Sequence, residues 1–107
     1  MKAYKLTGTS MSPLFKAGEV ALAAAAGLKR GDCAVYDLKG SKLLHRVIRT
    51  EEKGAWFSDD ACRLAPHFVP WENIEGKVLS SNPLKKGRIG LAYSKLRRLA
   101  ISLCPRT

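Results

Sequence analysis

The chain has 107 residues, of which 46% are hydrophobic and 26% are charged. This composition is that of one globular domain, and it excludes an intrinsically disordered chain. The formal net charge is +10, but it is unevenly placed: residues 76–107 carry eight Lys and Arg and no acid, whereas residues 1–75 have a net charge of only +2.

Residues 1–82 predict short β-strands that are separated by glycine-containing turns. The expected strands cover residues 3–8, 18–25, 31–40, 42–52, 55–58 and 73–81. Five or six short strands at this spacing are typical of a small antiparallel β-barrel or coiled sheet. We therefore predict a mainly β fold.

Residues 83–107 predict a basic extension, in which residues 89–103 form an amphipathic helix. Apolar residues recur at helical spacing between basic residues: Ala92, Leu96, Leu99 and Leu103. At 1.5 Å per residue this helix is too short to cross a bilayer. Two roles remain open: the helix packs on the sheet, or residues 91–103 contact an anionic membrane or nucleic acid.

The three cysteines are Cys33, Cys62 and Cys104, and their spacing predicts reduced thiols rather than a disulfide framework. Cys62 and His67 lie five residues apart, but two ligands alone make a poor zinc site, and we expect no metal or cofactor. The N-terminus lacks the apolar core of an export signal, and no apolar run is long enough to span a membrane. We expect a cytoplasmic protein.

The stretch GTSMSPLFKAGE, residues 8–19, places Ser10 between a strand and a turn. Serine and proline are ordinary turn formers, so this stretch on its own is consistent with a simple connection between strands. A nucleophilic serine needs an accessible turn, a base within about 3 Å and donors for the oxyanion. Of the two histidines, His45 lies within a predicted strand and His67 lies between prolines in a predicted loop.

Five segments together resemble, in order, the conserved boxes of the type I signal peptidase superfamily. They are GTSMSPLFKAGE (8–19), LKRGDCAVYDL (28–38), LLHRVIR (43–49), WFSDDA (56–61) and IEGKVL (74–79). The resemblance implies a β fold of the signal peptidase and LexA-like type, which agrees with the strand pattern. It also implies serine peptidase activity on a peptide or protein, with small residues preferred on the acyl side of the cut.

The resemblance implies Ser10 as the nucleophile and His45 as its general base, as in the Ser-His branch of the superfamily. A histidine with its usual pKa near 6.5 is an available base at neutral pH, whereas a lysine must first be desolvated. Asp60 aligns with the aspartate of the Gly-Asp motif, and Asp59 replaces the glycine. Asp60 either orients His45 or holds its loop, and no acid follows to complete a triad.

Around the nucleophile, the resemblance assigns oxyanion and substrate contacts to Gly8, Thr9, Met11 and Pro13, with the Ser10 backbone N–H as the main oxyanion donor. Gly8 stands where some relatives carry a serine hydroxyl. The membrane anchor of the family does not precede the first strand in this sequence, so we expect a different substrate, such as a leader peptide that binds as an added strand.

Two other functions remain open. A peptidase fold that has lost catalysis would use its basic tail to bind nucleic acid or a membrane surface. A self-cleaving repressor would share the fold and the serine but would use a lysine base; Lys42, three residues before His45, lies on the opposite strand face.

Overall fold

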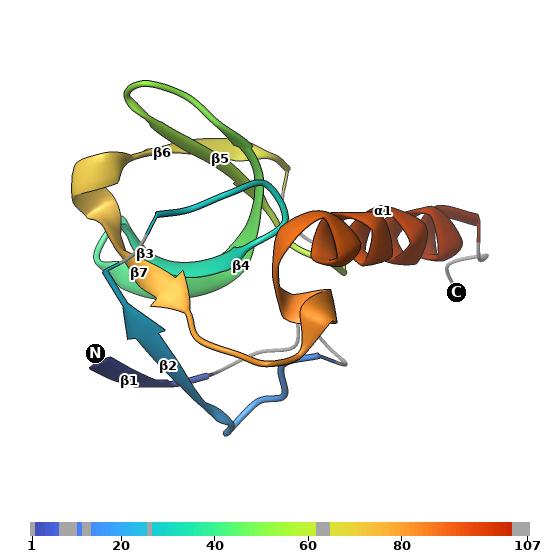
Figure 1. Ribbon diagram of the computed structural model, residues 1–107, viewed down its shortest axis with the longest axis horizontal. Helices are drawn as coiled ribbons and strands as arrows, with labels where there is room; N and C mark the ends of the chain where they lie inside the picture. Colours follow the sequence, from blue (N-terminus) through green and yellow to red (C-terminus); the bar gives the residue numbers. More distant parts are fainter. Residues whose placement is uncertain (1, 7–10, 12–13, 26, 62–64, 104–107) are drawn as a thin grey trace.

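The computed structural model describes residues 2–6, 11, 14–25, 27–61 and 65–103. In these residues, seven antiparallel strands form one sheet in the order β1-β2-β7-β3-β4-β5-β6. The sheet curls into a half-barrel, and helix α1 lies beside it (Figure 1). The predicted mainly β fold with a C-terminal helix is therefore confirmed.

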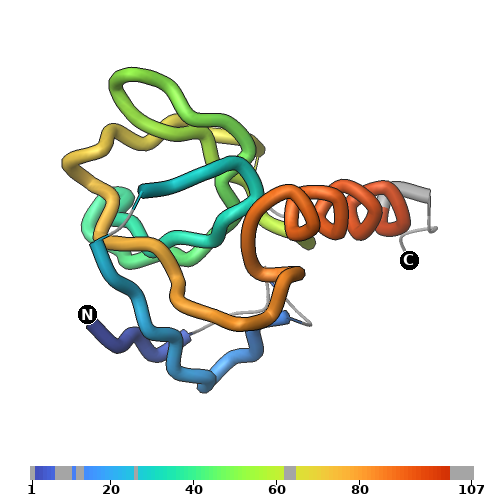
Figure 2. The backbone as a smooth tube through the Cα atoms, viewed as in Figure 1, coloured from blue at the N-terminus to red at the C-terminus, as the bar shows by residue number. Residues whose placement is uncertain are grey.

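The strands are short, except for the central β4. They are β1 Lys2–Lys5, β2 Val20–Ala24, β3 Cys33–Leu38, β4 Ser41–Thr50, β5 Gly54–Ser58, β6 His67–Pro70 and β7 Ile74–Val78. Two 3₁₀ turns follow β6 and β7, η1 Trp71–Asn73 and η2 Pro83–Lys85, and α1 spans Gly87–Leu103. Figure 2 traces the backbone from β7 through η2 into α1.

Strand β6 corrects the prediction that His67 lies in a loop. The flanking prolines favoured a loop, because proline cannot donate to a β-ladder. β6 is the last strand of the sheet, where it pairs only with β5, and Pro70 lies opposite Gly54. A proline is tolerated at such an edge, since only one side of the strand must be hydrogen-bonded.

The two faces of the sheet carry separate apolar clusters, because side chains alternate along each strand. On β3, Cys33 and Val35 pack in a cluster with Met11 and Phe15. Tyr36 belongs to the other cluster, which lies inside the curled strands: Ala34, Tyr36, Val47, Ala55, Phe57 and Val69. Cys33 is a buried free thiol, as predicted, whereas Cys62 and Cys104 lie outside the described residues.

The start of α1 packs closely on the turn before β3. Gly31 has a φ of +92°, and a Cβ placed on it would lie 1.7 Å from the carbonyl oxygen of Gly87. The side chain of Asp32 accepts a hydrogen bond of 2.9 Å from the Gly87 N–H, an orphan donor at the helix N-terminus. Gly31 and Asp32 thus fix where α1 meets the sheet.

Helix α1 packs a side with both apolar and polar residues against the sheet. Leu91 and Ser94 are buried, and Arg98 donates a 3.1 Å hydrogen bond to Ser58. The predicted apolar positions Leu96 and Leu99 are instead 67% and 55% exposed. Among the described residues, no helix is both long enough and apolar enough to cross a bilayer.

Candidate active site

His45 lies near the middle of β4, where it faces Ala34 of β3 across the ladder. His45 is only 3% exposed, because Tyr36 and His67 pack against its ring, and it lies on an interior strand that pairs on both sides. Strand pairing therefore fixes the backbone of the candidate base, and burial restricts its ring. Such a position suits a side chain whose orientation must be held.

A pocket of about 210 Å³ opens beside this histidine. Its wall includes His45 and Leu44 of β4, the apolar Phe15 and Leu6, and Met11. Lys5 and Lys42 also line the pocket. The pocket therefore combines apolar walls with two basic residues, and it has room for a side chain of a bound peptide.

Several predicted site residues lie outside the described residues: Gly8, Thr9, Ser10 and Pro13. Met11 is described, and it follows Ser10 directly in the chain. Its side chain is buried, and its sulfur accepts a 3.3 Å hydrogen bond from the backbone N–H of Asp60. Met11 thus connects the candidate nucleophile segment, the loop after β5 and the pocket that His45 lines.

Asp60 is bound to partners other than His45. Its carboxylate accepts hydrogen bonds from Arg46 of β4, at 2.7 Å and 3.3 Å, and from the hydroxyl of Ser94 in α1, at 2.5 Å. Arg46 also donates to the backbone oxygens of Gly31 and Leu84. This network joins the sheet, η2 and α1, and it supports the loop-holding role that the sequence left open.

The fully buried Asp59, rather than Asp60, has the stronger electrostatic effect on His45. Burial lowers the pKa of His45 to about 4, and the negative charge of Asp59 acts in the opposite direction. His45 is therefore neutral at pH 7 and has a lone pair available to accept a proton. The sequence alone predicts Asp59 only as a replacement for glycine, because the order of adjacent residues does not reveal which carboxylate acts more strongly on His45.

Two further residues contact His45, and the sequence analysis assigned neither to the site. The hydroxyl oxygen of Tyr36 lies 2.7 Å from Nδ1 of His45 and 2.5 Å from Nε2 of His67. Tyr36 is the aromatic residue of the segment LKRGDCAVYDL, and it is wholly buried in β3. Only the folding of β6 against β5 brings His67 into reach, so no local signal marked it.

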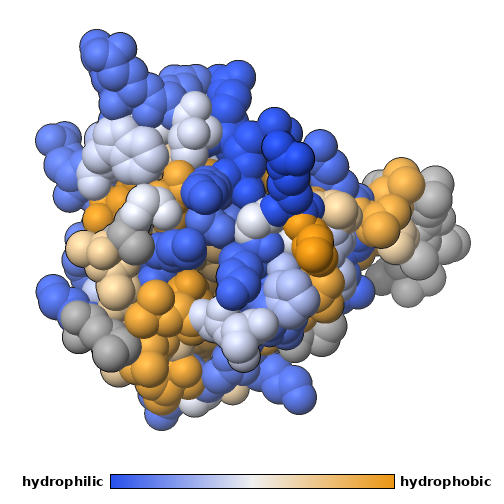
Figure 3. Space-filling model, viewed as in Figure 1, coloured by the Kyte–Doolittle hydropathy of each residue, from blue (hydrophilic) through white to orange (hydrophobic). Residues whose placement is uncertain are grey.

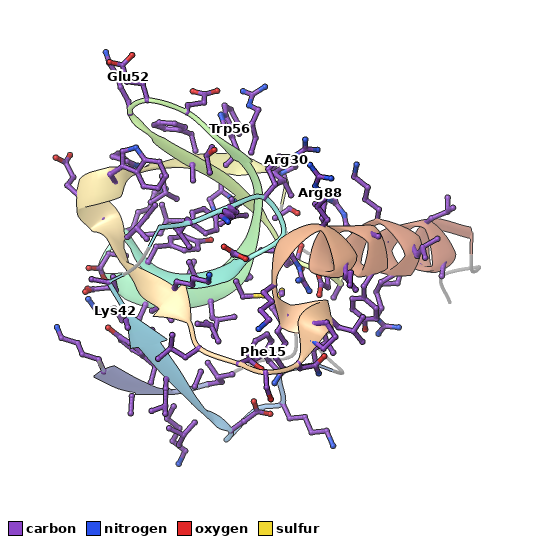
Figure 4. All side chains as sticks on the ribbon, viewed as in Figure 1. Phe15, Arg30, Lys42, Glu52, Trp56 and Arg88 are labelled. Carbon is purple, nitrogen blue, oxygen red and sulfur yellow. The ribbon has the colours of Figure 1, made fainter. Side chains whose placement is uncertain are left out.

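Lys42 is unsuited to be the base. Its ammonium group pairs with Asp37 at 2.8 Å and with Glu75. The hydrogen bonds to Asp37, and then to Glu75, raise the pKa of Lys42 above its usual value. Lys42 is thus a cation at neutral pH, and Figure 4 shows its label beside the end of β2.

Within the described residues, no three His, Cys, Asp or Glu side chains gather as a metal ion would require. Comparisons with models of protein families, with curated proteins and with solved structures found no significant match to this chain.

Proposed function

We propose that this protein is a serine endopeptidase in which Ser10 is the nucleophile and His45 is the general base. The observation that carries the proposal is that His45 lines the same pocket as Met11, the residue bonded to Ser10. The resemblance of five ordered segments to the type I signal peptidase superfamily supports the same assignment.

The proposed reaction follows the usual course of serine acyl transfer. His45 takes the proton from the Ser10 hydroxyl as its oxygen attacks the scissile carbonyl, and the backbone N–H of Ser10 stabilises the oxyanion. The resulting imidazolium gives its proton to the leaving amine, which leaves an acyl group on Ser10. A water then repeats the sequence and releases the acid.

The electrostatics fit a base that is charged only during the reaction. Burial keeps His45 neutral in the resting protein, since it lowers the imidazole pKa to about 4. The buried charge of Asp59 favours the imidazolium that forms after proton transfer. A negative charge close to the base thus takes over part of the role of a triad aspartate.

The substrate is proposed to be an extended peptide that adds a strand to the sheet. β1 is an edge strand of the described sheet, and Tyr4 and Lys5 of β1 line the pocket with Leu6. An edge strand offers unpaired backbone groups, and an adjacent pocket selects one side chain. The pocket, of about 210 Å³, has room for one substrate side chain, and the family resemblance implies a small residue on the acyl side of the cut.

The experiment is labelling with a serine-reactive activity probe, read by intact mass at pH 7.5. We expect one adduct on the wild type, none on Ser10→Ala, and a labelling rate about 10²–10⁴-fold lower in His45→Ala. Ser41→Ala, which removes an exposed hydroxyl at the start of β4, is the matched control and should label like the wild type. Equal labelling of Ser10→Ala and the wild type would show that the proposal is wrong.

A second candidate function, binding to an anionic membrane surface, is favoured by the outer face of α1. Ile89, Leu96 and Leu99 are all more than half exposed and follow one another at intervals of seven and three residues. Figure 3 shows hydrophobic side chains at the surface of the helix among hydrophilic ones. Buried helix residues such as Ser94 occupy the opposite side.

The basic residues around this exposed apolar surface favour an anionic lipid as its partner. Arg88 and Lys95 are exposed on α1, and Arg30 lies next to Gly31, which packs against Gly87 (Figure 4). Apolar side chains flanked by cations suit the headgroup region of anionic lipid, whereas two copies of such a surface repel each other. Nucleic acid would use the cations but would leave the apolar side chains in water.

Co-sedimentation with vesicles tests this second candidate. We expect binding to phosphatidylglycerol vesicles but not to phosphatidylcholine vesicles, and loss of binding in the double variant Ile89→Ser/Leu96→Ser. The control Val20→Ser/Leu22→Ser removes two exposed apolar side chains from β2 and should bind like the wild type. Binding to duplex DNA that the Ile89→Ser/Leu96→Ser variant retains would instead identify the cations as a nucleic-acid site.

A further inference from the structure

We propose that Tyr36 and His67 act as positioning residues for His45, in the place that an aspartate has in a Ser-His-Asp triad. They would do so through a chain of hydrogen bonds that starts at a backbone carbonyl and ends at Nδ1 of the base. This inference rests on the proposed function, because it assigns a role to the tautomer of the proposed general base.

The direction of each of these hydrogen bonds follows from the contact between His67 and the backbone of Ala65. Nδ1 of His67 lies 3.0 Å from the carbonyl oxygen of Ala65. A carbonyl oxygen only accepts hydrogen bonds, so Nδ1 of His67 carries the hydrogen. In a neutral imidazole the other nitrogen is then an acceptor, and Nε2 of His67 accepts from whatever donor faces it.

That donor is the hydroxyl of Tyr36, 2.5 Å from Nε2 of His67. A phenol has one hydrogen, and once it is donated to His67 the Tyr36 oxygen is left as an acceptor. The remaining neighbour of this oxygen is Nδ1 of His45, at 2.7 Å, which must therefore donate. Neutral His45 thus carries its hydrogen on Nδ1 and its lone pair on Nε2.

This tautomer is the one that a base using Nε2 requires, because only the unprotonated nitrogen can take the serine proton. The three rings come from β3, β4 and β6, so the chain holds only when those strands are in register. Phe57 packs against Tyr36 with a ring-centroid distance of 4.3 Å, and Tyr36 is fully buried. The hydroxyl is therefore held in place by packing as well as by its two hydrogen bonds.

The protonation state of Tyr36 is also suited to this role. Burial, and secondly the charge of Asp59, raise the pKa of Tyr36 well above its usual value. The phenol therefore keeps its hydrogen at neutral pH. Two roles of a triad aspartate are therefore held by different residues. Tyr36 and His67 orient the base, and Asp59 supplies the negative charge.

The test is ¹⁵N NMR of the histidine rings in the full chain at pH 8. The sequence has only two histidines, so His67→Gln assigns the remaining signals to His45. In the wild type we expect Nδ1 of His45 to be protonated and Nε2 to be unprotonated. A wild-type His45 with its hydrogen on Nε2 would overturn the inference.

Tyr36→Phe, which keeps the ring and removes only the hydroxyl, tests the consequence. We expect the His45 hydrogen to redistribute toward Nε2 and the probe-labelling rate to fall roughly 10- to 100-fold, less than the ~10⁴ that follows when a base is locked in the wrong tautomer. Tyr93→Phe removes a hydroxyl from α1 and should leave both readouts unchanged. An unchanged tautomer and rate in Tyr36→Phe would overturn the inference.

A second variant covers a loss of folding, and the Ser10→Ala result separates this inference from the proposed function. If Tyr36→Phe lowers the folded fraction, His67→Phe removes the acceptor of the Tyr36 hydroxyl at a half-buried edge position and gives the same readouts. If Ser10→Ala labels like the wild type, the peptidase proposal fails, yet the ring-nitrogen signals still decide whether the chain of hydrogen bonds sets the tautomer.

Discussion

Arg46 and Asp60 form an ion pair of 2.7 Å in which neither side chain is exposed to solvent. The remaining donors and acceptors of the pair contact Ser94 and backbone oxygens, so the charges are desolvated but well satisfied. Removing one partner of such a pair leaves the other charge buried without compensation.

Asp60→Ala should therefore lower the free energy of unfolding by about 3–5 kcal/mol, as measured by urea denaturation. Asp37→Ala is the control, since it removes a carboxylate from an exposed pair with Lys42 and should cost much less. The labelling rate per folded Asp60→Ala molecule should stay near the wild-type rate. A large fall in that rate would instead assign Asp60 a direct role in catalysis.

The labelling rate should depend on pH through His45. Burial lowers its pKa to about 4, so the base is already deprotonated at pH 5.5. We expect the rate to stay level from pH 5.5 to 8 and to halve near pH 4, where the imidazole takes up a proton. An inflection at the usual histidine pKa of about 6.5 would show that His45 is solvated in the working protein.

The free energy of unfolding should depend on pH through the same residue. The folded pKa of about 4 lies below the unfolded value of about 6.5, so the unfolded chain binds more protons between these limits. The free energy of unfolding then has its full value above pH 6.5. It decreases as the pH falls toward 4, by up to about 3 kcal/mol. Denaturation curves at several pH values measure this decline, and His45→Gln should remove it.

The contact between Gly31 and Gly87 should be sensitive to one methyl group. Gly31→Ala combines a φ of +92° with a Cβ placed 1.7 Å from the Gly87 oxygen, so the start of α1 must move. Gly40→Ala is the matched control: its φ is +85°, and nothing lies within 4 Å of the added Cβ. Gly40→Ala should cost about 1–2 kcal/mol from backbone strain alone, and Gly31→Ala clearly more, by thermal unfolding. Equal losses would contradict the close approach.

Six of the seven described strands and the C-terminal helix could be predicted from sequence patterns, and the resemblance to signal peptidases implied the candidate pair of Ser10 and His45. Strand alternation, turn glycines and helical spacing are local patterns, and local patterns are readable from neighbouring residues. The motif around Ser10 and the one around His45 are likewise short and contiguous. Their order and spacing match those of the signal peptidase superfamily, and this match can be recognised without knowledge of the fold.

The tertiary structure alone decided what surrounds His45 and what α1 exposes. β6 forms despite its prolines because β5 offers it an edge, and this pairing places His67 beside Tyr36. The side of α1 that carries Ser94 turns inward because Ser94 meets the buried Asp60–Arg46 pair, which leaves Leu96 in solvent. These contacts join residues far apart in the chain, and only the register of the strands and the docking of the helix bring such residues together.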